Sequence, residues 1–138
     1  MIVTEHIDLQ SSGKTDIIDI TDKVAYKVAN SGITSGIVTV FIVGSTAGIT
    51  TIEYEPGLES DFQKLWQRIV PDDIRYEHNE RWGDGNGYSH VRASLLGASI
   101  TVPFNDQKLG LGTWQQIIVV DFDNRPRSRN IMLQIMGE

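Results

Sequence analysis

Two histidines, His78 and His90, flank the segment whose residue types are best suited to chemistry. Neutral imidazoles can hold a divalent ion such as zinc, or act as general bases near neutral pH. The carboxylates that would complete a site for zinc or magnesium are Glu53, Asp61 and Asp84. The histidines are twelve positions apart and no metal-ligand spacing recurs, so spacing alone indicates a metal only weakly. The alternative is that His90 hydrogen-bonds the backbone at a helix N-terminus.

The segment between the histidines ends in "GDGNG", residues 83–87, directly before an expected helix. Glycines free the backbone around Asn86 and Gly87, and exposed N–H groups in such an arrangement bind phosphate or carboxylate. The spacing matches neither the dinucleotide fingerprint nor the P-loop. The same residues would also make a flexible connection that uses glycine for its turns.

Hydroxyl and guanidinium groups elsewhere offer further contacts to an anion. Ser45 and Thr46 follow an apolar stretch and either donate hydrogen bonds to a ligand or form a tight turn. Arg125, Arg127 and Arg129 alternate, so on a strand all three would share one face and clamp an oxyanion. Otherwise they form a solvated hairpin end.

Trp114 and its neighbour Gln115 are the remaining candidates. An indole flanked by amides would stack on a planar ring. A tryptophan is more often a core or interface residue, and that alternative stays open.

Composition limits the classes of protein to consider. The chain has 138 residues, 40% hydrophobic and 22% charged, as in an ordinary globular domain. A net charge of −6 argues against nonspecific nucleic-acid binding. The absence of cysteine excludes disulfides, thiol catalysis and cysteine-ligated zinc. No signal peptide or membrane span is visible, so we expect a soluble cytoplasmic protein without a nucleic-acid or membrane partner.

The elements that must position these groups are strands and helices without a βαβ rhythm. Strands are expected over 2–9, 16–20, 36–43, 48–55, 98–104, 113–122 and 130–136. The continuously apolar 36–43 predicts a central strand covered on both faces, and the last two strands predict an antiparallel hairpin. We therefore expect a single α+β domain of mostly antiparallel sheets, a sandwich or pseudo-barrel with about three helices.

Three helices are expected between these strands. The first runs from a Thr21 cap to about Ser31, and the third covers about 88–96. The second begins at residue 59 or 60, after Pro56 and Gly57 have terminated the preceding strand. It ends before Pro71. Its apolar stripe is Phe62, Leu65, Trp66 and Ile69. Residues 72–87 are expected to form one long loop.

The order of the motifs is more specific than any one of them. The succession "STAGITTIEYEP", "YEH", "GDGNGYSHVRASLLGASITVPF", "LGLGTWQQI" and "DFDNRPRSR" resembles the YjbQ-like family from about residue 11 to 135. The resemblance implies a small single-domain α+β protein that is generally a homotrimer. The positions matching the family's site are Glu53, Asp61, His78, Asn86, His90, Gln115 and Arg127. A histidine usually precedes the hydroxylated pair in the family, whereas this chain has Gly44 and so lacks a third nitrogen donor.

The family has been described as a secondary thiamine-phosphate synthase, so the resemblance implies that reaction. The nitrogen of thiazole phosphate displaces pyrophosphate from hydroxymethylpyrimidine pyrophosphate, which requires the anion to be neutralised and two rings to be aligned. The candidates are Arg127, Arg129 and the glycine-rich loop for the anion, Trp114 or Tyr88 for a ring, Gln115 or Asn86 for its nitrogens, and His90 or His78 for a proton, water or metal. Two alternatives stay open: a metal-assisted hydrolase of a phosphorylated metabolite, and a non-catalytic trimer that binds a small molecule.

Overall fold

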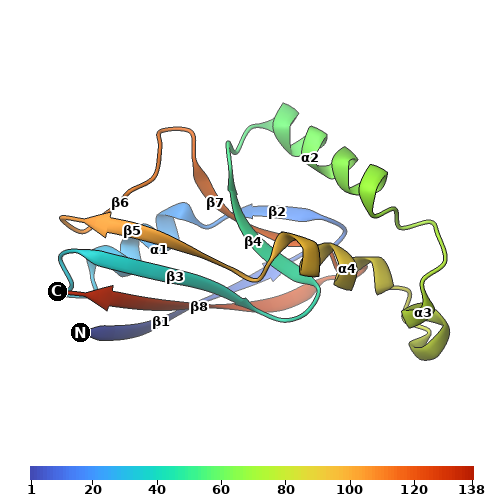
Figure 1. The fold of residues 1–138 in the computed structure, drawn as a ribbon, viewed down its shortest axis with the longest axis horizontal. Coiled ribbons are helices and arrows are strands. Elements are labelled where there is room, and N and C mark those ends of the chain that lie inside the picture. Colours follow the sequence, from blue (N-terminus) through green and yellow to red (C-terminus); the bar gives the residue numbers. More distant parts are fainter.

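The computed structural model describes residues 1–138 and folds them into two antiparallel sheets and four helices (Figure 1). The strands are β1 (Ile2–Ser11), β2 (Asp16–Asp19), β3 (Gly36–Val43), β4 (Ala47–Ile52), β5 (Ser99–Asn105), β6 (Lys108–Leu109), β7 (Gln116–Asp121) and β8 (Arg127–Gly137). The helices are α1 (Thr21–Ala29), α2 (Pro56–Ile69), α3 (Glu77–Trp82) and α4 (Gly87–Leu96). The expected single-domain α+β fold of antiparallel sheets is confirmed, with α3 as a helix beyond the three expected.

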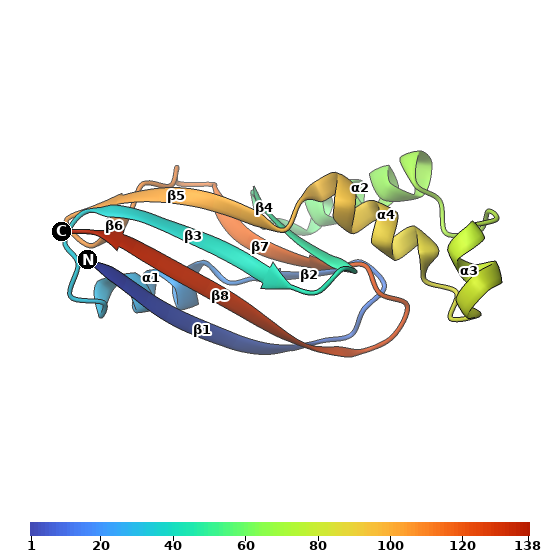
Figure 2. The same ribbon diagram turned by 60° about the horizontal axis from the view of Figure 1, so that its bottom comes forward.

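A five-stranded sheet in the order β1-β8-β3-β5-β6 lies in front of a three-stranded sheet in the order β2-β7-β4 (Figure 2). The main core fills the space between the two sheets and includes Val24 and Val28 of α1. A smaller core lies on the other face of the three-stranded sheet, where Trp66 of α2 and Tyr88 of α4 pack. The three-stranded sheet is therefore covered on both faces, and helices α2 and α4 pack on the face away from the main core.

Strand β7 is the strand that is covered on both faces. Ile117 and Val119 point into the main core, whereas Ile118 and Val120 point toward α2 and α4. Continuous apolar sequence is required there, because neither face of the strand meets water.

The prediction that residues 36–43 are covered on both faces is wrong. Strand β3 is central, between β8 and β5, but Ile37, Phe41 and Val43 are 41%, 42% and 48% exposed. Their neighbours across the ladder, Met136 and Met132, are exposed as well. An apolar outer face of this kind on a small protein indicates a contact surface.

The expected hairpin between the last two strands is also wrong. Strand β7 pairs with β2 and β4, whereas β8 pairs with β1 and β3 in the other sheet. Residues 122–126 therefore connect two sheets instead of turning back within one. A short polar connection between two strand-like segments is compatible with both topologies, and burial of the β7 faces selects the second.

Two helix starts differ from expectation. Helix α2 begins at Pro56, because the Glu55 carboxylate accepts hydrogen bonds from the Gly57 and Leu58 N–H groups, and proline is favoured in the first turn. Thr21 does not cap α1: it is the first helical residue, and its hydroxyl donates to Asp19. The predicted α2 stripe is only partly buried, since Leu65 and Ile69 are exposed.

The stretch expected to be a single loop, residues 72–87, contains helix α3. Gly83 ends this helix in the left-handed conformation, with φ of 72°, which glycine adopts without strain. None of the four helices combines the length and the apolar character that a bilayer crossing requires.

Candidate functional site

His78 and His90 are brought together by the packing of α3 beside α4. Their ring centroids are 4.6 Å apart and the ring planes are inclined by 44°. His78 Nδ1 is buried without a hydrogen-bond partner, and the nearest carboxylate oxygen, Oδ1 of Asp84, is 3.5 Å away. A buried ring nitrogen without a hydrogen-bond partner is uncommon in folded proteins, so this pair is the centre of the candidate site.

The start of α4 is fixed against α3 by its own backbone. The Gly87 N–H donates to Asn79 Oδ1 over 2.8 Å, and a Cβ at Gly87 would lie 2.8 Å from the Tyr76 Cβ. Glycine is required here because the two segments approach so closely. Because Gly87 is buried and its N–H is already bonded, it does not offer the free anion-binding group that the sequence suggested.

His90 does not cap its helix, which corrects the structural alternative. The helix begins at Gly87 with Asn86 as its cap residue, the Asn86 side chain makes no capping hydrogen bond, and Asn79 instead accepts from the Gly87 N–H. His90 is half-buried, and its N–H bonds to the Asn86 carbonyl over 3.3 Å as an ordinary helical residue. Its imidazole is therefore available to face His78.

The buried amide of Asn86 lies between two carboxylates. In one orientation its nitrogen donates to Asp123 Oδ1 over 3.4 Å, and when turned over it donates to Asp84 Oδ1 over 3.0 Å. The two orientations are alternatives, so Asn86 donates either to the acidic residue beside His78 or to the carboxylate in the connection after β7.

Two acidic residues on either side of Phe122, Asp121 at the end of β7 and Asp123 just after it, are fully buried. Arg129 donates to both oxygens of Asp121, over 2.7 Å from Nε and 2.9 Å from Nη2, which makes a bidentate ion pair. Thr46 donates to Asp123 Oδ2 over 2.9 Å and accepts from Arg129 over 2.6 Å. This network joins β4, β7 and β8 and closes one end of the sandwich.

The ionisation of Asp123 is set by its hydrogen bonds. Burial raises the pKa of this carboxyl, but donors from Thr46, the Asn124 N–H and Arg127 outweigh that effect. The pKa therefore lies below the ordinary aspartate value of 3.8. Asp123 is an anion at neutral pH and can orient the cations around it.

The predicted clamp of three arginines does not form. Arg125 lies exposed in the turn before β8, and Arg129 is occupied by Asp121. Arg127 donates to Asp123 from Nε over 2.8 Å, and its side chain is 32% exposed. Its two Nη groups make no hydrogen bond within the chain, so Arg127 can still bind an anion.

Gly44, at the family's histidine position, faces the same network. Its φ is +136°, and a Cβ there would lie 2.6 Å from Arg129 Nη1, so a guanidinium occupies the space beside this residue. Ser45 is exposed and, with Gly44, Ser94 and Gly97, lines a cavity of about 280 Å³ near the end of α4. Thr46 is buried in the ion-pair network and is not free for a ligand.

The other predicted site residues lie away from the histidine pair. Glu53 and Trp114 line a groove of about 480 Å³ at the far end of β4, and Trp114 is 71% exposed. Gln115 donates to Thr51 over 3.2 Å. Asp61 is exposed on α2, and no hydrogen bond or ion pair joins it to either histidine. Tyr88 is buried with its ring against Arg92, 4.8 Å from the guanidinium carbon.

The residues at the histidine pair fit a divalent ion poorly. Zinc sites in proteins use three or four side-chain donors. No group of three or more histidine, aspartate and glutamate side chains in the chain is arranged to hold a metal ion. The unpartnered His78 Nδ1 can be satisfied equally by a proton donor or acceptor on a ligand.

The sequence analysis missed Asp121, Asp123 and Arg92. The sequence "VVDFD" could have indicated the two aspartates, because it places two acids at the end of an apolar strand, where ionised side chains require partners. Arg92 occupies the inward stripe of α4 with Tyr88 and Leu96, at i, i+4 and i+8. A cation on that stripe is a sign of a buried polar group.

Comparison with known proteins supports one assignment. The family model described as "UPF0047 protein YjbQ-like" matches residues 5–138. A UPF0047 protein of Methanothermobacter thermautotrophicus is 39% identical over 99% of this chain and 94% of its own, and UPF0047 protein YugU of Bacillus subtilis is 33% identical over 95% and 97%. A crystal structure from Sulfolobus solfataricus, described as a YbjQ-like protein of unknown function, superposes with a TM-score of 0.90 at 34% identity over the full length of both chains. A hypothetical protein from Aeropyrum pernix gives a TM-score of 0.91 at 27% identity over 99% of both chains. The chain belongs to the YjbQ-like UPF0047 protein family.

Proposed function

We propose that the site around His78 and His90 binds a small phosphorylated molecule and exchanges protons with it. The observation that carries this proposal is the buried, unpartnered Nδ1 of His78 beside a second imidazole. Arg127, held by Asp123, supplies a partly exposed cation with free donors at the start of β8. Proton donors and a guanidinium together suit a substrate that releases an anion.

The specific reaction we propose is thiamine-phosphate synthesis, which rests on the family resemblance. The ring nitrogen of thiazole phosphate forms a bond to the methylene carbon of hydroxymethylpyrimidine pyrophosphate. The carbon–oxygen bond to pyrophosphate breaks, and pyrophosphate leaves with the bonding electrons. Arg127 would neutralise the leaving group, and a protonated imidazole of the pair would donate a proton to it. No step is assigned to the zinc or magnesium expected from the sequence, because the residues at the histidine pair fit a divalent ion poorly.

The activity is tested by supplying the two substrates to the purified protein and measuring thiamine phosphate by liquid chromatography. We expect His90→Gln to lower the rate by about a hundredfold or more, because general acid–base groups contribute on that order. The matched control is His6→Gln, since His6 is exposed on β1 and contacts Asn130 instead of the site. Equal rates for His90→Gln and the wild-type protein would contradict the proposal.

A second candidate is a non-catalytic protein that binds the same class of molecule. It is favoured by Gly44, whose side-chain space holds the Arg129 guanidinium instead of a third imidazole. Calorimetry with pyrophosphate would then show binding that weakens in Arg127→Gln, while no thiamine phosphate forms with either protein. Zinc titration adds a check on the site, because we expect no tight zinc binding that depends on His90.

We also propose that the protein assembles as a homotrimer through the outer face of the five-stranded sheet. Phe41 pairs with Met132 and Ile37 with Met136 across the β3–β8 ladder, and all four are exposed in the single chain. Burial of such a face stabilises association. Light scattering should give three times the chain mass for the wild-type protein and a smaller mass for Phe41→Asp. A wild-type monomer would contradict the trimer.

A further inference from the structure

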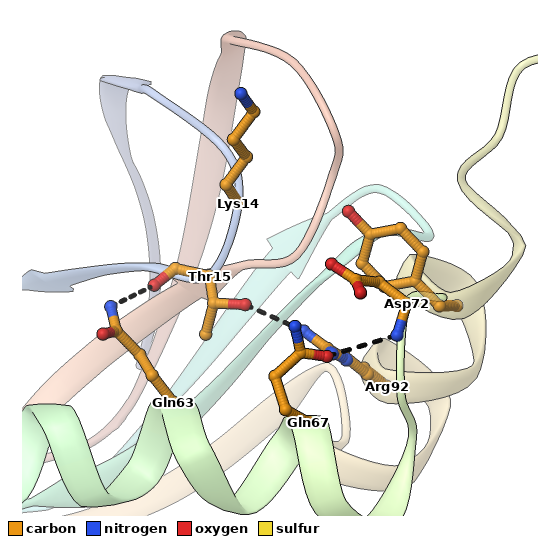
Figure 3. A pocket seen from close by; sticks show the side chains of 7 residues that line it. Lys14, Thr15, Gln63, Gln67, Asp72 and Arg92 are labelled. Atoms are coloured by element: carbon orange, nitrogen blue, oxygen red, sulfur yellow. Dashed lines mark hydrogen bonds between the residues drawn. The ribbon is translucent and has the colours of Figure 1, made fainter. Parts of the chain in front are cut away.

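A second polar cavity lies on the other side of α4 from His90. Arg92 follows His90 by two residues, so the helical turn separates their side chains by about 200°. The cavity has a volume of about 280 Å³ and is lined by Lys14, Thr15, Gln63, Gln67, Asp72, Tyr88 and Arg92 (Figure 3). Only one of these residues is hydrophobic, so the cavity favours a polar ligand.

Arg92 is the buried cation of this cavity, with 3% of its surface exposed. Its Nε donates to the Val70 carbonyl over 2.9 Å, its Nη1 to Thr15 Oγ1 over 3.0 Å, and its Nη2 to Gln67 Oε1 over 2.9 Å. All three acceptors are neutral, and no carboxylate forms an ion pair with Arg92. A guanidinium has five N–H donors, so two remain without a partner.

A buried cation without an ion-pair partner is energetically unfavourable. Burial lowers the pKa of Arg92 from its ordinary value, although the charge of Asp72 acts in the opposite direction. The aromatic faces of Tyr88 and Phe122, 4.8 Å and 6.0 Å from the guanidinium carbon, compensate only in part. An anion in the cavity would complete the set of partners.

The loop that covers the cavity is held in an unusual conformation. Lys14 and Thr15 have φ values of 56° and 62°, which residues other than glycine rarely adopt. The Lys14 N–H donates to the Asp123 carbonyl over 2.6 Å, and Gln63 Nε2 donates to the Thr15 carbonyl over 3.1 Å (Figure 3). These contacts keep the Thr15 hydroxyl on Arg92 and place Lys14, whose ammonium has no ion pair, in the wall of the same cavity.

We propose that this cavity is a second anion site, which takes inorganic phosphate or the phosphate group of a small monoester. The two free N–H groups of Arg92, the Lys14 ammonium and the unbonded amide nitrogen of Gln67 supply the donors. Asp72 is an exposed carboxylate in the wall of the cavity, and its charge opposes the anion. The site therefore carries a net charge of one positive unit and binds the phosphate through hydrogen bonds as much as through charge.

The test is calorimetric titration of the full chain with inorganic phosphate, with chloride as the reference anion. Arg92→Lys should weaken phosphate binding at least about tenfold, because it removes the fork of donors. Lys14→Asn keeps a residue that tolerates the left-handed backbone, and it should weaken binding about threefold to tenfold. Asp72→Asn should strengthen binding about twofold to fivefold by removing the opposing charge.

Matched controls separate this site from the histidine site. Lys108→Asn removes an exposed lysine of β6 and should leave phosphate affinity unchanged. Arg127→Gln and His90→Ala should also leave the Arg92-dependent binding unchanged, whatever they do to catalysis. The proposal is overturned if phosphate does not bind, if only Arg127→Gln weakens binding, or if Lys14→Asn and Asp72→Asn have no effect. Lys14→Asn and Asp72→Asn change exposed residues, so they test the proposal even if Arg92→Lys destabilises the fold.

Discussion

Two buried arginines of this protein have opposite surroundings. Arg129 on β8 is 8% exposed and lies against the Asp121 carboxylate, whereas Arg92 on α4 is 3% exposed and bonds only to neutral oxygens. The first has its counter-charge within the chain, so it joins strands, and its Nη1 faces Gly44. The second has no ion pair and lines a polar cavity. Burial of a cation alone therefore does not identify a ligand-binding group. The presence or absence of a carboxylate partner within the chain distinguishes a structural cation from one that can bind a ligand.

The largest expected effect comes from removing the paired arginine. Arg129→Met leaves Asp121 buried without its bidentate partner, and breaking such a pair costs about 3–5 kcal/mol in the free energy of unfolding. Arg92→Met removes hydrogen bonds to neutral groups and should cost less, about 1–3 kcal/mol. Urea denaturation of both variants measures the difference. Equal losses would show that the two arginines do not differ as described.

A double variant sharpens that result. Arg129→Met combined with Asp121→Asn removes the uncompensated charge, so it should be more stable than Arg129→Met alone. A double variant that is less stable by the sum of the two single losses would indicate independent sites and would contradict a coupled ion pair.

A smaller effect is expected at Gly44, whose neighbour is Arg129. Gly44→Ala should lower the free energy of unfolding by about 2 kcal/mol, because the backbone is left-handed and the new Cβ would lie 2.6 Å from Arg129 Nη1. Gly32→Ala is the matched control: its φ is +81°, but no atom lies within 4 Å, so only backbone strain of about 1 kcal/mol applies. Thermal denaturation measures both. A control that is as unstable as Gly44→Ala would show that Arg129 does not restrict this position.

The smallest effect is a change in acid sensitivity. The pKa of Asp123 is lowered in the folded protein, so its contribution to stability is complete above 3.8 and is lost as the pH falls through the lower folded value. The free energy of unfolding of Asp123→Asn should therefore fall less below pH 3.8 than that of the wild-type protein. Arg92→Met should show the same fall as the wild-type protein. Urea midpoints measured between neutral pH and pH 2 provide the comparison. An unchanged acid dependence in Asp123→Asn would contradict this assignment.

Sequence reasoning identified the fold class and the histidine pair for local reasons. The glycine-rich segment 83–87 and the apolar helix after it marked where His78 and His90 would stand. Strand pairing was less predictable, because β3 and β7 are both continuously apolar. Only the tertiary packing decides that helices cover the second face of β7 and that the outer face of β3 stays open. The prediction of an arginine clamp was wrong because alternation along a strand predicts which side chains share a face. It does not predict that the Asp121 and Asp123 carboxylates lie beside those side chains.

The most direct measurement follows the Nε–H resonances of Arg92 and Arg129 by NMR during a phosphate titration, with assignments from the two Arg→Lys variants. The account predicts a saturable shift of the Arg92 resonance with the same affinity as calorimetry, while the Arg129 resonance stays in place. A shift confined to the Arg129 resonance, or equal shifts of both resonances, would contradict this prediction. Arg92 could then not be distinguished from Arg129 as the arginine that binds phosphate.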